Sequence, residues 1–211
     1  MISEILPVPV VVETAYSDPP EARLEPEEQA VIAPAVESRR REFTTVRHCA
    51  RLALTRLGVP YRPLLPGLRG APGWPDGVIG SLTHCAGFRA AAVARAEEVL
   101  SVGIDAEPAL PLPEGVLDAI ALPAEQRRNT ALTAAHPDVP WDRILFSAKE
   151  SVYKTWFPLT QRFLDFSEAD LTLHPDGTFT ATLLVPSPLP TLSGRWRVHE
   201  GHLATAITVL R

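Results

Sequence analysis

Two long stretches of this 211-residue chain have apolar positions at helical spacing. The first runs over residues 27–57 with an interruption near Pro34, and a Gly-x-Pro sequence directly after it ends the helix. The second covers residues 111–157. Within it, Pro140 marks the start of an amphipathic helix that we expect over 141–157.

Period-two alternation, which is typical of strands, appears in five places. Three runs follow one another closely at 78–85, 88–96 and 99–107, so we expect them to form a three-stranded meander. Two hairpins are predicted near the end of the chain, at 171–185 around a Pro-Asp-Gly turn and at 194–210 around a Glu-Gly turn.

Helices followed by strands occur twice, which predicts an α+β fold made of two α+β halves. We place the halves at residues 1–102 and 103–211, joined near Gly103. The segment 57–77 is too rich in Gly and Pro to be anything but loop.

Composition narrows the function classes. The chain is 45% hydrophobic, enough for a real core, and its net charge of -5 argues against nucleic-acid binding, which needs a basic face. The opening stretch "MISEILPVPVVVET" is too short and too broken by prolines for a signal peptide or a membrane span. Two cysteines make no disulfide framework, so we expect a cytoplasmic protein without a membrane partner.

The segment "FSAKESVYKTWF", residues 146–157, places Lys149, Glu150, Tyr153 and Lys154 on the predicted helix, away from its apolar stripe. The simplest interpretation is a solvent-exposed ion pair between Glu150 and Lys154, four residues apart and worth about 0.3–0.5 kcal/mol.

The strand "VGIDAEP" changes that interpretation. Asp105 and Glu107 point to the same side of an extended strand, where two carboxylates repel unless a cation lies between them. Mg²⁺ is the cation that such hard oxygen ligands suit, and Mn²⁺ is also possible. A solvated strand end remains the alternative.

Two further groups have both a structural and a functional interpretation. Thr83 and His84 end a predicted strand in "GSLTHCAG", and a lone histidine is usually structural. Arg39 and Arg47 belong to the basic segment "ESRRREFTTVRHCAR". Such segments are mostly solvated surface, but guanidinium groups also bind phosphate in bidentate fashion.

Taken together, "GSLTHCAGFRAAAVA", "VGIDAEP" and "FSAKESVYKTWF" resemble the 4'-phosphopantetheinyl transferases of the Sfp-type branch, especially the bacterial enzymes of siderophore, polyketide and mycobacterial lipid pathways. The resemblance covers over half the chain. It implies a pseudo-twofold pair of α+β halves with the active site between them. It also implies transfer of the phosphopantetheine arm of coenzyme A to a serine of an apo acyl or peptidyl carrier protein, with release of adenosine 3',5'-bisphosphate.

The resemblance also implies roles for individual residues. The magnesium ligands are Asp105, Glu107 and Glu150, and the pyrophosphate lysines are Lys149 and Lys154. The residues around the other coenzyme phosphates are Arg39, Arg47, Arg69, Thr83 and His84. Tyr153, with Phe163 and Leu164, would line the pantetheine channel. One departure concerns the loop before "GWPDG", where relatives carry a second lysine and this chain has Pro66.

Physical chemistry adds Glu150 as the base for the incoming serine and Lys154 as a charge-neutralising partner of the phosphates. Arg127 or Arg128 is a candidate contact for the acidic carrier, and a monomer is expected because the pairing of halves is internal. Two other functions stay open. A magnesium phosphohydrolase acting on nucleotides or coenzyme A would use similar residues. A non-catalytic module that binds coenzyme A or carriers is the third possibility, and the retained Asp105, Glu107, Glu150 and Lys154 argue against it.

Overall fold

The computed structural model describes all 211 residues, and its contacts divide the chain into two compact units. The N-terminal unit comprises Pro7–Val102 with Val209–Arg211, and the C-terminal unit comprises Met1–Leu6 with Gly103–Thr208. The chain passes from the N-terminal unit to the C-terminal unit between Val102 and Gly103, and a few residues at each terminus belong to the opposite unit.

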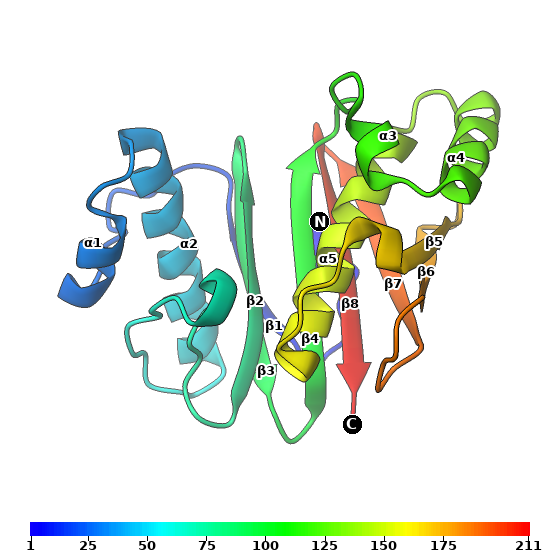
Figure 1. Ribbon diagram of the computed structural model, residues 1–211. Coiled ribbons are helices and arrows are strands. Elements are labelled where there is room, and N and C mark those ends of the chain that lie inside the picture. Colours follow the sequence, from blue (N-terminus) through cyan, green and yellow to red (C-terminus); the bar gives the residue numbers. More distant parts are fainter. The chain divides into compact units, whose positions relative to one another are not determined.

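The N-terminal unit packs helices on one face of a three-stranded antiparallel sheet (Figure 1). Its strands, in the order β1-β3-β2, are β1 (Val11–Ala15), β3 (Phe88–Arg95) and β2 (Val78–Cys85). Its helices are α1 (Pro26–Ile32), α2 (Glu37–Arg56) and the short 3-10 helix η2 (Leu68–Gly70). Helix α2 contacts all three strands. Its small residues Cys49, Ala50 and Ala53 belong to the core, which allows the helix to lie close to the sheet.

The first predicted helical stretch is confirmed, including its break near Pro34, which separates α1 from α2. Strand β1 was not predicted, because Pro7 and Pro9 interrupt the apolar run that leads into it. The prediction of a meander was wrong: β2 and β3 pair, but β1 occupies the other edge of β3. The third predicted strand therefore joins a different sheet.

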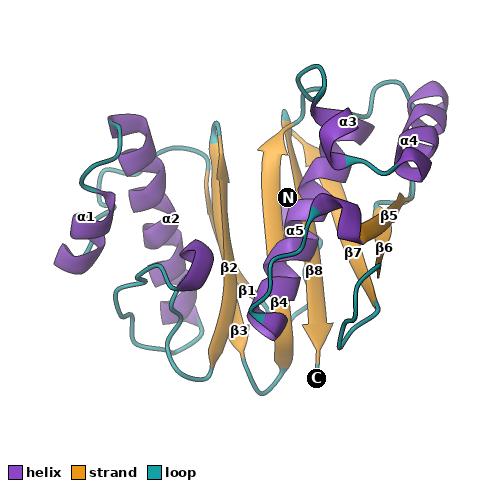
Figure 2. Ribbon diagram, viewed as in Figure 1, coloured by secondary structure: helices purple, strands orange, loops and turns teal.

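The C-terminal unit contains a five-stranded sheet with helices against it (Figure 2). In sheet order the strands are β4 (Val99–Pro108), β8 (His202–Leu210), β7 (Thr191–His199), β6 (Thr178–Leu183) and β5 (Ala169–Leu173). The first four residues of β4 and the last two of β8 are counted with the N-terminal unit. The helices are η1 (Ile2–Glu4), α3 (Val116–Ile120), α4 (Pro123–Ala135), α5 (Trp141–Thr160) and η3 (Phe166–Glu168). The pairs β5–β6 and β7–β8 are antiparallel, which confirms both predicted hairpins.

Helix α5 begins where the sequence predicts and runs three residues further, with Pro158 in its last turn and the left-handed Gln161 ending it. Its predicted apolar stripe is buried: Trp141, Ile144, Leu145, Ala148, Val152, Thr155 and Trp156. The fold is α+β, as predicted. None of the helices combines the length and hydropathy of a bilayer span.

Candidate active site

Gly103 allows strand β4 to lie directly against helix α5. A Cβ at this position would lie 2.2 Å from the carbonyl oxygen of Ser151 and 2.3 Å from the hydroxyl oxygen of Thr155, far inside van der Waals contact. Only glycine fits there. The first residue of the G-I-D-A-E motif therefore brings the acids of β4 close to the polar residues of α5.

Four polar residues occupy one face of α5 at intervals of four, three and four residues: Arg143, Ser147, Glu150 and Lys154. Three of them contact or influence Asp105, which is only 5% exposed. The hydroxyl of Ser147 donates to Oδ2 of Asp105 at 2.8 Å, and the ammonium of Lys154 donates to Oδ1 at 2.7 Å. Both carboxylate oxygens of this buried acid are thus hydrogen-bonded, as its burial requires.

Glu107 lies two residues further along β4 and is held by Arg143. The guanidinium donates to Oε2 of Glu107 at 3.0 Å and also to the carbonyl oxygens of Leu110 and Pro111. Burial raises the pKa of Glu107, and the nearby charge of Asp105 raises it further, against the opposing effect of Arg143.

Glu150 is half-buried and makes no hydrogen bond or ion pair. Burial raises the pKa of its carboxyl group; Lys154 opposes the rise, and Asp105 adds to it. The expected surface ion pair between Glu150 and Lys154 does not form, because Lys154 binds Asp105 instead. Glu150 is therefore the one acid of this group without a partner and with a raised pKa.

The charges of this cluster do not cancel. Three carboxylates and two cations, Lys154 and Arg143, leave one negative charge in a partly buried region. Oxygen ligands with excess negative charge fit a hard divalent cation. No group of three or more His, Cys, Asp or Glu side chains is arranged to hold a metal ion in this structure, so the metal assignment of Asp105, Glu107 and Glu150 stays a prediction.

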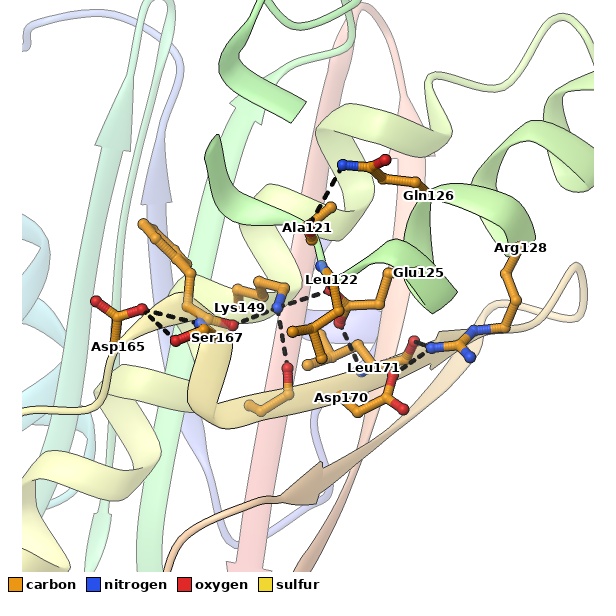
Figure 3. Close-up of polar contacts among 12 residues, drawn as sticks. Ala121, Leu122, Glu125, Gln126, Arg128, Lys149, Asp165, Ser167, Asp170 and Leu171 are labelled. Carbon is orange, nitrogen blue, oxygen red and sulfur yellow. Dashed lines mark hydrogen bonds and ion pairs between the residues drawn. The ribbon is translucent and has the colours of Figure 1, made fainter. Parts of the chain in front are cut away.

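Lys149 lies elsewhere than the resemblance implied. Its ammonium is buried and donates to the carbonyl oxygens of Phe166 and Ala169, at 2.6 and 2.9 Å, and lies 2.9 Å from Oε2 of Glu125 (Figure 3). These three partners use all three ammonium hydrogens. The structure thus places Lys149 in an ion pair inside the unit, and its assignment to coenzyme phosphate stays a prediction.

Tyr153 lies one helical turn beyond Lys149 and belongs to an aromatic group. Its ring centroid is 5.7 Å from that of Phe157 and 5.8 Å from that of Phe163, whose side chain is 54% exposed. The rings of Tyr153 and Phe157 thus form an apolar surface on the part of α5 after Glu150. Phe163 extends this surface in the segment that follows the helix.

In the N-terminal unit, Arg39 from α2 and His84 from the end of β2 come together. The Arg39 guanidinium contacts Nε2 of His84, and Nδ1 of His84 lies 3.3 Å from Oε2 of Glu42. Arg39 is in the first turn of α2, where the helix dipole favours an anion. Thr83, the neighbour of His84 on β2, is buried.

The other two predicted phosphate arginines have different surroundings. Arg47 is buried, its guanidinium lies 4.0 Å from the ring centroid of Phe43, and it donates to the carbonyl of Leu64 at 3.2 Å. Burial lowers the pKa of its guanidinium, and the positive charge of Arg39 adds to this effect. Arg47 is thus packed in the core within electrostatic range of Arg39, and its assignment to coenzyme phosphate stays a prediction. Arg69 is exposed in η2 with a left-handed backbone.

Comparison with known proteins agrees with this arrangement. Residues 27–94 match the 4'-phosphopantetheinyl transferase N-terminal domain, and residues 101–207 match the 4'-phosphopantetheinyl transferase superfamily. The chain belongs to the 4'-phosphopantetheinyl transferase superfamily. The second match alone covers half of the chain and contains the whole Asp105 cluster.

Three proteins named as 4'-phosphopantetheinyl transferases are similar to it along almost its entire length. The chain is 57% identical to the enzyme Svp of Streptomyces mobaraensis over 99% of this chain and 89% of the relative. It is 50% identical to PptT of Mycobacterium tuberculosis, covering 99% and 98% of the two chains, and 47% identical to Npt of Nocardia iowensis, covering 98% and 99%.

Sequence reasoning missed three residues of this phosphopantetheinyl transferase. Arg143 and Ser147 could have been found, because they share the spacing of Glu150 and Lys154 on α5 and form a second, polar stripe beside the apolar one. Glu125 gave no such signal, since it meets Lys149 only through the packing of α4 on α5.

Proposed function

We propose that this protein transfers the 4'-phosphopantetheine arm of coenzyme A to a serine of an apo acyl or peptidyl carrier protein. The products are the holo carrier and adenosine 3',5'-bisphosphate. The observation that carries the proposal is the cluster on β4 and α5, where Asp105 is bound by Lys154 and Ser147 beside an unpartnered Glu150.

The reaction forms a bond between the serine oxygen and the β-phosphorus of coenzyme A and breaks the bond from that phosphorus to the bridging oxygen. The serine proton must be removed as the new bond forms. Glu150 is suited to accept that proton, because its carboxylate has no hydrogen-bond donor to release first. Its raised pKa also makes it a better proton acceptor than an ordinary glutamate.

The departing oxygen and the phosphoryl oxygens carry negative charge that must be stabilised. Lys154 supplies one positive charge from α5, and its side chain is 27% exposed, so it is within reach of a ligand. Arg143 supplies a second, although its contacts to Glu107, Leu110 and Pro111 indicate that it mainly fixes the end of β4.

Asp105, Glu107 and Glu150 are the residues that would hold Mg²⁺, or Mn²⁺ in its place. Bound there, the ion would neutralise pyrophosphate oxygens. The oxygen-only donor set and its residual negative charge support this assignment.

For the remaining parts of the coenzyme, we propose that Arg39, His84 and Thr83 bind phosphate, with Arg69 contributing from its exposed loop. The position of the Arg39 guanidinium, in the first turn of α2 and beside His84, supports phosphate binding, because a guanidinium and a helix N-terminus both favour an anion. Tyr153 and Phe163 would line the path of the pantetheine arm, together with Leu164.

A carrier protein is the proposed partner, and Arg127 is the proposed contact on α4. Arg127 is exposed without an ion pair, whereas Arg128 is bound to Asp170 and to the carbonyl of Leu171. We propose a monomer in the cytoplasm, where both cysteines, which are free thiols here, stay reduced.

Intact-protein mass spectrometry tests the function. Incubation with coenzyme A, Mg²⁺ and an apo carrier should add one phosphopantetheine arm to the carrier and none to a carrier whose acceptor serine is replaced by alanine. Release of inorganic phosphate without carrier modification would instead support a phosphohydrolase, and coenzyme binding without either product would support a non-catalytic module.

A further inference from the structure

The buried pair Lys149–Glu125 joins four elements of the C-terminal unit at one point (Figure 3). Glu125 lies in the first turn of α4 and Lys149 in the middle of α5, and the carbonyls that Lys149 binds belong to the first residue of η3 and the first residue of β5. Both side chains are almost completely buried, with 0% of Glu125 and 2% of Lys149 exposed.

Every polar atom of this pair has a partner. Oε2 of Glu125 accepts from the backbone N–H of Leu122 at 2.7 Å as well as from Lys149, and Oε1 accepts from the N–H of Leu171 at 2.7 Å. Glu125 thus caps its own helix and holds the backbone of Leu171, the third residue of β5. Burying two charges is tolerated only with such complete hydrogen bonding.

The pair also controls residues of the proposed active site. Lys149 precedes Glu150 in the chain, so a shift of α5 at Lys149 displaces the Glu150 carboxylate directly. At its other end, the ammonium holds the carbonyl of Phe166, three residues after Phe163, whose ring packs on Tyr153 one turn along α5. The same ammonium therefore fixes both sides of the Tyr153–Phe163 contact.

We propose that Lys149 and Glu125 are positioning residues: their ion pair holds Glu150 and the Tyr153–Phe163 surface in the geometry for transfer, and Lys149 does not contact coenzyme A. This inference rests on the proposed function for its kinetic part. It replaces the phosphate-binding role that sequence resemblance gave to Lys149.

A double-mutant cycle with Lys149→Met and Glu125→Gln separates the two roles. Lys149→Met leaves Glu125 buried without its cation, so the melting temperature should fall by about 6–20 °C, as expected for breaking a buried pair in a chain of this size. The double variant removes the uncompensated charge and should recover at least half of that loss. Arg128→Met is the control, because it breaks a neighbouring pair that is about one-third exposed on each side, and should shift the melting temperature by only about 2 °C.

Kinetics with coenzyme A, Mg²⁺ and an apo carrier give the second measurement. Below the melting temperature of each variant, Lys149→Met should lower kcat by about 10- to 100-fold, the effect of misplacing reacting groups. The KM for coenzyme A should stay within about twofold, and the double variant should recover part of kcat. A direct contact between Lys149 and phosphate predicts the opposite: a KM raised at least about tenfold in both the single and the double variant, which would overturn the proposal.

The two proposals fail in different ways. If the wild-type protein modifies no carrier, the proposed function is refuted, while the melting-temperature cycle still tests the pair. If the wild-type protein is active but the effects of Lys149→Met and Glu125→Gln on melting temperature simply add, the pair is not coupled and the positioning role is refuted.

Discussion

Gly103→Ala tests whether the contact between β4 and α5 builds the active site. The new methyl group would lie 2.2 Å from the Ser151 carbonyl oxygen, 2.3 Å from the Thr155 hydroxyl oxygen and 2.8 Å from the Thr155 backbone nitrogen. Normal contacts of this kind are about 3.5 Å, so strand and helix must separate by about 1 Å. Two of the three atoms are backbone, so no change of rotamer relieves the clash.

The cost of such overpacking is about 1–3 kcal/mol, and the rigid neighbours place Gly103→Ala at the upper end of that range. At about 2–4 °C per kcal/mol for a chain of this length, the melting temperature should fall by about 6–12 °C. The same displacement of about 1 Å would move Asp105 away from Lys154 and Ser147. The kcat should therefore fall about 100-fold in protein that is still folded.

Thermal unfolding followed by circular dichroism and carrier modification at 25 °C measure these effects. Gly67→Ala is the control, since its added methyl group would meet its nearest neighbour, the Ala71 carbonyl oxygen, at an ordinary 3.5 Å. Adding Thr155→Ala to Gly103→Ala should rescue little, because the Ser151 oxygen remains. A Gly103→Ala enzyme with wild-type kcat and a melting temperature within about 2 °C would refute the reasoning.

Further predictions concern Glu150, Arg127 and Arg47. Glu150→Gln should abolish transfer while coenzyme A still binds, measured by calorimetry; near-normal turnover would contradict its role as base. Because the pKa of Glu150 is raised in the folded state, the metal-free wild type loses stability as the pH rises through that pKa. The melting temperature of Glu150→Gln should therefore be higher than that of the wild type at pH 8, and this difference should disappear at pH 4. Arg127→Glu should raise the KM for the carrier about tenfold but leave the KM for coenzyme A unchanged; an unchanged carrier KM would remove Arg127 from the interface. Arg47→Met should lower the melting temperature, because the carbonyl of Leu64 loses its hydrogen-bond donor, and should change the affinity for coenzyme A little. A large loss of affinity at constant stability would instead support a contact between Arg47 and phosphate.

Sequence periodicity predicted most of the helices and strands, although not β1, but it did not predict which strands pair. The α5 stripe from Trp141 to Trp156 and both closing hairpins were predictable, because local spacing decides which face is buried and where a turn falls. The sheet to which β4 belongs was not, because strand pairing depends on which edge is available. In this fold β1 occupies the edge of β3 that the meander would have needed.

The site shows the same division at the level of single residues. The acids on β4 and Glu150 and Lys154 on α5 could be selected from their motifs. Lys149 belongs to the same motif as Glu150, but adjacent residues of a helix point in different directions. The side chain of Lys149 points toward Glu125 and forms an ion pair with it. Only packing shows that a glutamate 24 residues earlier completes that lysine's hydrogen bonds.

Lys149 and Lys154 are the only lysines of the chain, and both are on α5. The side chain of Lys149 is 2% exposed and that of Lys154 is 27% exposed, while the terminal amine of Met1 is paired with Glu4. An amine-reactive dye, cross-linker or sensor surface therefore has essentially one side chain to acylate, and that side chain is bound to Asp105. Acylation of Lys154 should therefore inactivate this protein, and a terminal tag is the suitable way to immobilise it.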